Sequence, residues 1–142
     1  MKRKLPIALI IIVIISIITG CSNNEFRATY KKFNESYLLA TDFVDKGNNT
    51  IERLHAIDES IIKTELIKMK EYIDFMNSKK KTKAENIVFN SSKNYYQDLE
   101  DLIEIIEDLA DKDNVTEEEE FKVFSEISSI STARQLINRS AY

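Results

Sequence analysis

The chain has few of the residues that cross-link or interrupt a fold. It contains one cysteine, one proline, two glycines and no tryptophan in 142 residues. A single cysteine excludes an intramolecular disulfide, so the core alone must hold the fold together. A β-sandwich or barrel of this length would need several turns containing glycine or proline, and the only proline, Pro6, lies near the N-terminus. The composition therefore favours long helices joined by a few polar loops.

Residues that carry catalysis or bind metal are also scarce. His55 is the only histidine, so the sequence has no His/Cys cluster that could form a zinc site. It has no G-x-S-x-G turn that would present a serine nucleophile, and no glycine-rich loop that would bind phosphate. We therefore expect a protein that is not an enzyme, with no catalytic residues, no metal and no cofactor.

The N-terminal segment has the pattern of an export signal. The basic residues Lys2, Arg3 and Lys4 precede an apolar run over 7–18 that only Ser16 interrupts. A basic start, a short apolar middle and a small-residue end are typical of a secretory signal. A stable membrane-spanning helix needs about 20 apolar residues, and this run is shorter. We expect a cleaved signal, with an uncleaved membrane anchor as the alternative.

The end of this run indicates which kind of signal it is. The segment Ile18-Thr19-Gly20-Cys21 resembles the lipobox of bacterial lipoproteins, an aliphatic residue and two small residues before a cysteine. In that family the cysteine thiol receives a diacylglyceryl group, and a peptidase cleaves just before it, here between Gly20 and Cys21. The alternative is an ordinary secretory cleavage site with a cysteine there by chance.

The lipobox resemblance implies a signal peptide over 1–20 and a lipidated tether over 21–25. Two fatty acyl chains, such as palmitate, would hold Cys21 on the outer face of the cell membrane, because two chains anchor durably where one is marginal. The mature chain would keep all 24 acidic residues and lose three of the 20 basic ones, which gives a formal charge of −7. That charge argues against binding to nucleic acid, which requires neutralisation of phosphates by Lys and Arg.

Apolar residues recur at helical spacing in four segments. The first runs from Phe26 to Val44 and is followed by Gly47, a residue favoured just past a helix end. The others reach to about 78, 112 and the C-terminus, and the third has a weaker stretch at 90–92. Each of these three opens on a predicted capping box: Asn49 with Glu52, Thr82 with Glu85, and Thr116 with Glu119.

These segments predict an all-α domain over 26–142, an antiparallel up-and-down bundle of three to four helices. We expect the first helix, next to the tether, to pack most loosely. Its aromatic residues could line a ligand groove, but at helical spacing core packing is the better interpretation. They are Phe26, Tyr30, Phe33 and Tyr37.

Two charged clusters have a functional and a simpler interpretation. The acidic cluster around the third loop suggests a calcium site, with Asp108, Asp111 and Asp113 followed by 117–120. A calcium loop of the helix-loop-helix type needs glycine at its sixth position. Counted from Asp111, that position is Thr116. A solvated turn and negative charge at a helix N-terminus account for the same residues. The basic segment over 79–83 could contact anionic headgroups or wall polymers, although a solvated loop is the simpler interpretation.

Beyond the lipobox, the chain resembles small helical lipoproteins of low-GC Gram-positive bacteria in its size and in helical segments such as 66–70 and 126–130. This resemblance carries over no functional residues. We expect a non-enzymatic interaction module that binds a surface protein or peptide through a helix face or groove. The alternative function is a protective surface lipoprotein that blocks phage entry, conjugation or a bacteriocin.

Overall fold

The computed structural model describes residues 24–140, and over these residues it contains helices and no strand. The predicted all-α bundle is therefore confirmed. The predicted signal peptide, the cleavage site at Gly20 and the lipidation site at Cys21 lie outside the described residues. Over the described part of the chain, no helix combines the length and apolar character needed to cross a membrane.

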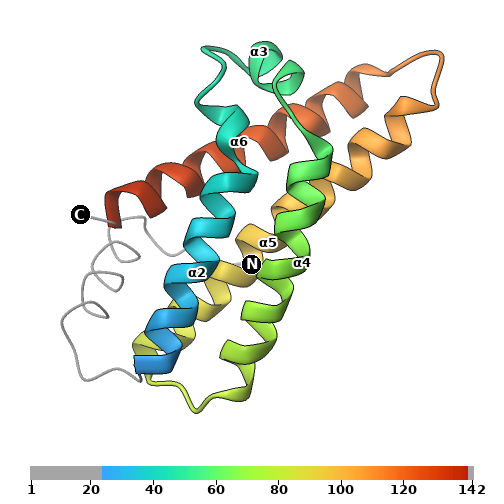
Figure 1. The fold of residues 1–142 in the computed structure, drawn as a ribbon. Coiled ribbons are helices and arrows are strands. Elements are labelled where there is room, and N and C mark those ends of the chain that lie inside the picture. The colour runs from blue at the N-terminus through green and yellow to red at the C-terminus, as the bar shows by residue number, and fades with distance from the viewer. Residues whose placement is uncertain (1–23, 141–142) are drawn as a thin grey trace.

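Within residues 24–140, four long helices and two short ones follow one another (Figure 1). Helices α2, α4 and α5 run antiparallel to their neighbours, α4 packs against both α2 and α5, and α6 returns along α5 and crosses the bundle obliquely. The elements are α2 (Asn24–Ala40), the 3-10 turn η1 (Asp42–Val44), α3 (Thr50–His55), α4 (Glu59–Ser78), α5 (Lys83–Ala110) and α6 (Glu117–Ser140).

Helix α2 packs tightly, so the expectation of a loose first helix is wrong. Phe26, Phe33 and Tyr37 are completely buried, with 0% of each side chain exposed. The Tyr37 ring stacks on Phe33 at 6.3 Å between centroids and contacts the Tyr95 ring of α5 at 5.6 Å. Large aromatic rings bury the most apolar area per residue, which explains why this helix is held firmly. These aromatic residues form core rather than a ligand groove.

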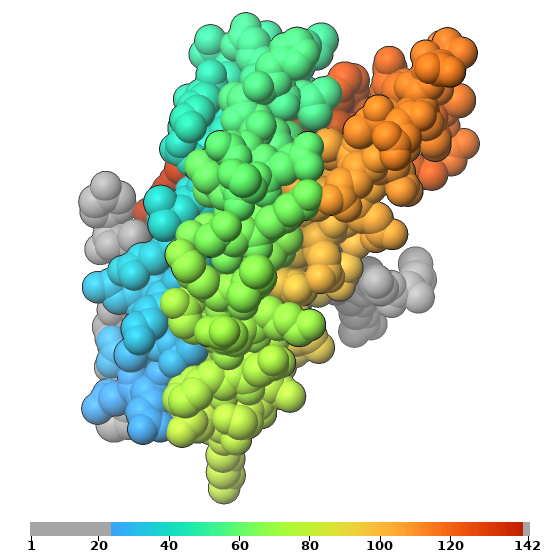
Figure 2. Space-filling view, turned by 45° about the vertical axis from the view of Figure 1, so that its right-hand side comes forward, coloured from blue at the N-terminus to red at the C-terminus, as the bar shows by residue number. Residues whose placement is uncertain are grey.

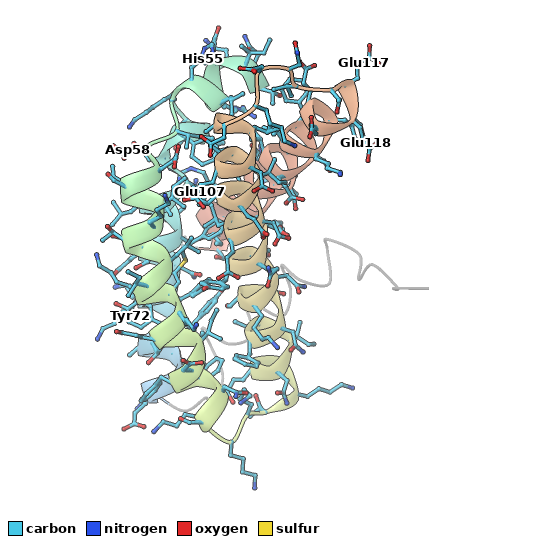
Figure 3. All side chains as sticks on the ribbon, turned by 90° about the vertical axis from the view of Figure 1, so that its right-hand side faces the viewer. His55, Asp58, Tyr72, Glu107, Glu117 and Glu118 are labelled. Carbon is cyan, nitrogen blue, oxygen red and sulfur yellow. The ribbon has the colours of Figure 1, made fainter. Side chains whose placement is uncertain are left out.

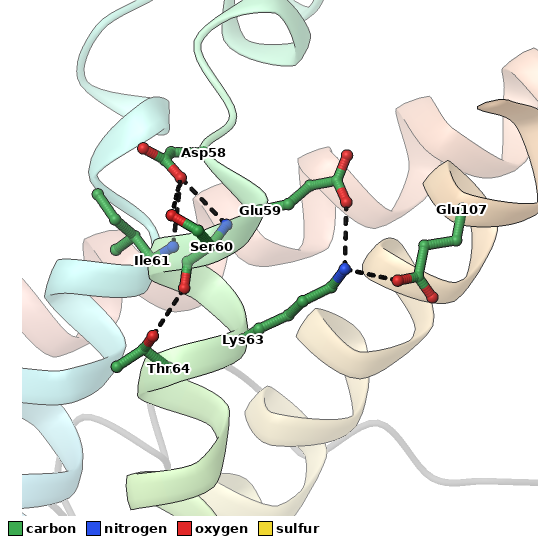
Figure 4. A network of polar contacts seen from close by, with 7 residues as sticks. All are labelled: Asp58, Glu59, Ser60, Ile61, Lys63, Thr64 and Glu107. Atoms are coloured by element: carbon green, nitrogen blue, oxygen red, sulfur yellow. Dashed lines mark hydrogen bonds and ion pairs between the residues drawn. The ribbon is translucent and has the colours of Figure 1, made fainter.

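The second predicted helix is divided into α3 and α4, contrary to the sequence prediction. The two helices are separated at Asp58, which caps the start of α4. Asp58 Oδ1 accepts hydrogen bonds from the backbone N–H of Ser60 at 3.0 Å and of Ile61 at 3.3 Å (Figure 4). An aspartate that caps a new helix competes with continuation of the preceding one. The division turns α3 away from the α4 stripe and leaves Ile51 57% exposed.

Two of the three predicted capping boxes are formed in full. Thr82 and Glu85 exchange side-chain to backbone hydrogen bonds of 3.2 and 2.7 Å at the start of α5. Thr116 and Glu119 do the same at 3.3 and 2.9 Å before α6. At α3 the Asn49 side chain caps as predicted. The Glu52 carboxylate, however, accepts from the backbone N–H of Asn48 instead of closing the box on Asn49.

Gly47 does not end an α-helix directly, because α2 stops at Ala40 and η1 intervenes. Its role is close approach: a Cβ at this position would lie 2.5 Å from the backbone nitrogen of Arg53. The Gly47 carbonyl also accepts a hydrogen bond from Arg53 Nε at 3.1 Å. The weak stretch predicted at 90–92 is continuous helix, where the Ser92 hydroxyl bonds to the Val88 carbonyl at 3.0 Å.

Candidate functional surface

His55 lies exposed at the last residue of α3 (Figure 3). Within residues 24–140, no three His, Cys, Asp or Glu side chains are arranged to hold a metal ion. The acidic residues over 117–120 begin α6, where the helix dipole favours negative charge. The acidic residues thus lie where the simpler interpretation, negative charge at a helix N-terminus, places them.

The predicted basic loop between α4 and α5 is partly a structural element. Lys81 Nζ donates to the carbonyls of Met76 at 2.9 Å and Asn77 at 3.0 Å, and these bonds add to the hydrogen bonding of the last turn of α4. Lys79 pairs with Glu25 of α2 at 2.5 Å and lies 4.6 Å from the centre of the Phe75 ring. These contacts place the first turn of α2 beside the α4–α5 loop.

Arg134 of α6 forms a buried polar cluster that the sequence analysis missed. Its side chain is 9% exposed, and Nη1 donates to the Leu38 carbonyl at 2.5 Å and to Thr41 Oγ1 at 2.8 Å. The Nη2 and Nε atoms both donate to Asp45 Oδ2, at 2.5 and 3.0 Å. The guanidinium therefore joins α6 to the end of α2 and to the segment after η1. Its position within the apolar stripe of α6 is the sequence signal that could have identified it.

Three carboxyl groups lie where α5 meets α6. The Ser129 hydroxyl donates to Asp98 Oδ2 at 2.7 Å, while burial and the nearby Asp101 charge raise the pKa of the Asp98 carboxyl. Burial, followed by the charges of Asp98 and Asp101, also raises the pKa of Glu126. On the core side, burial and the charges of Tyr30 and Asp98 raise the pKa of Tyr95 to about 12. Asp98 and Ser129 position α5 against α6, and repulsion between the carboxylates opposes this packing at neutral pH.

A small cavity lies between the end of α2, η1 and the start of α4. Its volume of about 20 Å³ is enough for about one water molecule. Pockets for small-molecule ligands have volumes of roughly 300–1,000 Å³, far more than this cavity offers. The cavity is lined by Leu39, Ala40, Asp42, Phe43, Lys46, Ala56, Asp58 and Ile61.

Negative charge is concentrated in one segment of the bundle, which we call the acidic arm and define as residues 98–126. It contains thirteen acidic and two basic residues, a net formal charge of −11, whereas the rest of the chain from Cys21 onward carries +4. Both lysines of the arm are paired, Lys112 with Glu119 and Lys122 with Glu118. The α5–α6 turn of this arm stands out from the side of the bundle (Figure 2).

Apolar side chains are exposed within the acidic arm. Phe121 is 72% exposed, Val115 43% and Phe124 37%, and we call these three residues the apolar tip. Glu117, Glu120, Phe121 and Phe124 follow the spacing of a single helical face. Figure 3 shows Glu117 and Glu118 projecting away from the bundle at this end. This face of α6 therefore combines the exposed Phe121 and Phe124 with the carboxylates of Glu117 and Glu120.

No family model matches the chain, and neither the curated proteins nor the solved structures compared with it gave a match.

Proposed function

We propose that this protein is a membrane-anchored surface lipoprotein whose helical domain is a non-enzymatic interaction module. Cys21 would carry the lipid, and the bundle would bind a protein or peptide at the outer face of the cell membrane. The anchor rests on the lipobox sequence Ile18-Thr19-Gly20-Cys21. The binding role rests on where the exposed apolar and charged groups lie in the fold.

The observation that carries the proposal is the distance between the start of α2, next to the proposed anchor at Cys21, and the acidic arm. Helix α2 begins at Asn24, three residues after Cys21, and its first turn is held to the α4–α5 loop by the Glu25–Lys79 ion pair. Helix α5 leaves that loop and spans 28 residues before the α5–α6 turn, a length of about 42 Å. The α5–α6 turn of the acidic arm therefore lies far from the first residues of α2 (Figure 1).

This arrangement suits a tethered binding domain. A lipid at Cys21 would hold the α4–α5 end near the bilayer, and the α5–α6 turn would then point away from it. The last turns of α5 are held to α4, because Lys63 of α4 pairs with Glu107 at 2.6 Å (Figure 4). A surface fixed to a rigid scaffold loses less entropy when it binds a partner.

Site-specific photo-crosslinking in cells that express the full-length protein tests the proposal. A photoreactive phenylalanine analogue is placed in turn at Phe121 of α6, Ile67 of α4 and Leu39 of α2, all exposed. We expect one protein or peptide to be crosslinked from a single position, and the purified pair to bind again in a direct assay. The same adducts from all three positions, or no adduct from any, would contradict the interaction role.

A further inference from the structure

We propose that the acidic arm and its apolar tip bind a cationic amphipathic peptide segment, one that carries Lys or Arg beside an apolar face. This inference rests on the proposed interaction role and names the chemistry of the partner. The surface is the α6 face formed by Glu117, Glu120, Phe121 and Phe124, together with Val115 in the preceding turn.

Phe121 and Phe124 are not needed to pack this part of α6 against the bundle. Val123 and Ile127 are 4% and 0% exposed, so they already provide the apolar contact between this part of α6 and the bundle. Phe121 nevertheless keeps 72% of its surface exposed, and Phe124 lies one turn further along the same face. Adjacent exposed aromatic residues are typical of interaction sites, where they supply most of the binding energy.

The charges of the same face identify the sign of the partner. Neither Glu117 nor Glu120 forms an ion pair with any residue between 24 and 140, and both lysines of the arm are paired with other carboxylates. A Lys or Arg placed beside the phenylalanines would therefore meet carboxylates without a counter-ion. The net charge of −11 on the arm would also attract a cationic partner from a distance and speed its association.

The same charge disfavours other occupants of this surface. A second copy of the chain would bring another arm of the same charge against the first, and like charges in contact repel each other strongly. An anionic bilayer would be repelled in the same way. Phe121 and Phe124 are three residues apart, which is a spacing of apolar anchors in recognition between helices.

Fluorescence anisotropy with a defined peptide tests this inference. The probe is a labelled synthetic amphipathic helix of about 18 residues, made of leucine on one face and lysine on the other. It is titrated with the membrane-fraction protein, obtained by expression of the full chain, in phosphatidylcholine nanodiscs, and empty nanodiscs give the background. We expect saturable binding that weakens as salt is added, because screening reduces the attraction between surface charges.

Two double variants separate the apolar from the charged contribution. We expect Phe121→Ser with Phe124→Ser, and separately Glu117→Gln with Glu120→Gln, to weaken binding about tenfold each. The matched controls lie on α4: Ile67→Ser removes an equally exposed apolar side chain, and Glu71→Gln an exposed carboxylate. We expect both controls to bind like the wild type. Circular dichroism of each variant checks that the bundle is still folded.

Three results would overturn the inference. The first is unchanged affinity in the Phe121 and Phe124 double variant. The second is equal binding of a peptide with the same composition but no apolar face, which would show attraction to charge alone. The third is equal binding of a peptide with glutamate in place of lysine. If the peptide-binding test fails but a specific crosslink forms from Ile67 or Leu39, the proposed interaction role is still supported. The absence of any crosslink would remove both.

Discussion

At the scale of single residues, Arg134 makes the most concentrated set of polar contacts. We expect Arg134→Ala to lower the free energy of unfolding by about 3 kcal/mol, because buried acceptors lose a charged donor. Those acceptors include the Leu38 carbonyl and Thr41 Oγ1. Urea unfolding followed by circular dichroism measures the effect. Arg139→Ala, an exposed arginine on the same helix, is the control and should change stability by less than about 0.5 kcal/mol.

The two arginine variants test whether the Arg134 cluster holds the end of α2 against α6. Equal and small losses for both would show that the apolar contacts are sufficient without the guanidinium. A large loss for Arg134→Ala alone would show that the core of this region depends on it.

Asp98 gives a prediction about pH. Its pKa is raised in the folded state, chiefly by burial, so the folded protein binds this proton more tightly than the unfolded chain does. The stability that this group contributes is fully present below its ordinary pKa of 3.8 and is lost as pH rises through the raised value. At neutral pH the charged carboxylate therefore opposes folding.

We expect Asp98→Asn to raise the melting temperature at about pH 7, because the amide can still accept from Ser129 without a charge at this half-buried position. At about pH 3.5 the wild-type carboxyl is protonated, and the difference should disappear. Thermal unfolding at the two pH values measures both effects. Asp113→Asn, an exposed position in the α5–α6 turn, is the control. A lower melting temperature for Asp98→Asn at pH 7 would show that the Ser129 contact needs the charge.

At the scale of helices, the capping boxes decide where α5 and α6 begin. We expect Thr82→Ala to lower the free energy of unfolding by about 1 kcal/mol, because the Glu85 backbone N–H loses its acceptor at the start of α5. Thr132→Ala, an exposed threonine in the middle of α6, should have no destabilising effect, since alanine has the higher helix propensity. Urea unfolding compares the two. A similar loss at both positions would contradict the role of the cap.

Helix boundaries were predictable from sequence where a local signal determined them. The pairs Thr82–Glu85 and Thr116–Glu119 satisfy backbone groups within four residues of each other, so their spacing was enough to place two helix starts. Asp58 was missed because its cap lies inside a continuous apolar pattern, which indicated a single helix over α3 and α4. The sequence Asp58-Glu59, an N-cap residue followed by an acidic residue in the first helical turn, was the available signal.

Contacts between distant segments could not be predicted from local pattern. Arg134 meets Asp45 across 89 residues of sequence, and nothing in either segment indicates the other. The exposure of Phe121 was also not evident, because it depends on which face of α6 the bundle covers. The charge of 117–120 was recognised, but only as a helix N-terminus. The apolar tip beside it required the packed structure.

At the scale of the whole molecule, negative charge is concentrated at the α5–α6 end and positive charge at the α4–α5 end. The acidic arm carries −11 while the remainder from Cys21 onward carries +4, and the exposed Lys80 and Lys83 lie at the α4–α5 end. That end also holds the first turn of α2 through Lys79. A lipid at Cys21 would therefore place positive charge toward an anionic bilayer and the acidic arm away from it.

Mass spectrometry of the membrane-fraction protein most directly tests the proposal that a lipid at Cys21 anchors the chain. The wild-type protein and Cys21→Ala are compared after expression of the full chain. We predict a wild-type N-terminus at Cys21 with added diacylglyceryl mass, and loss of that mass from the Cys21→Ala protein. A wild-type N-terminus at Cys21 without acyl mass, or an uncut chain beginning at Met1, would contradict the lipid anchor and indicate a secreted or membrane-spanning protein instead.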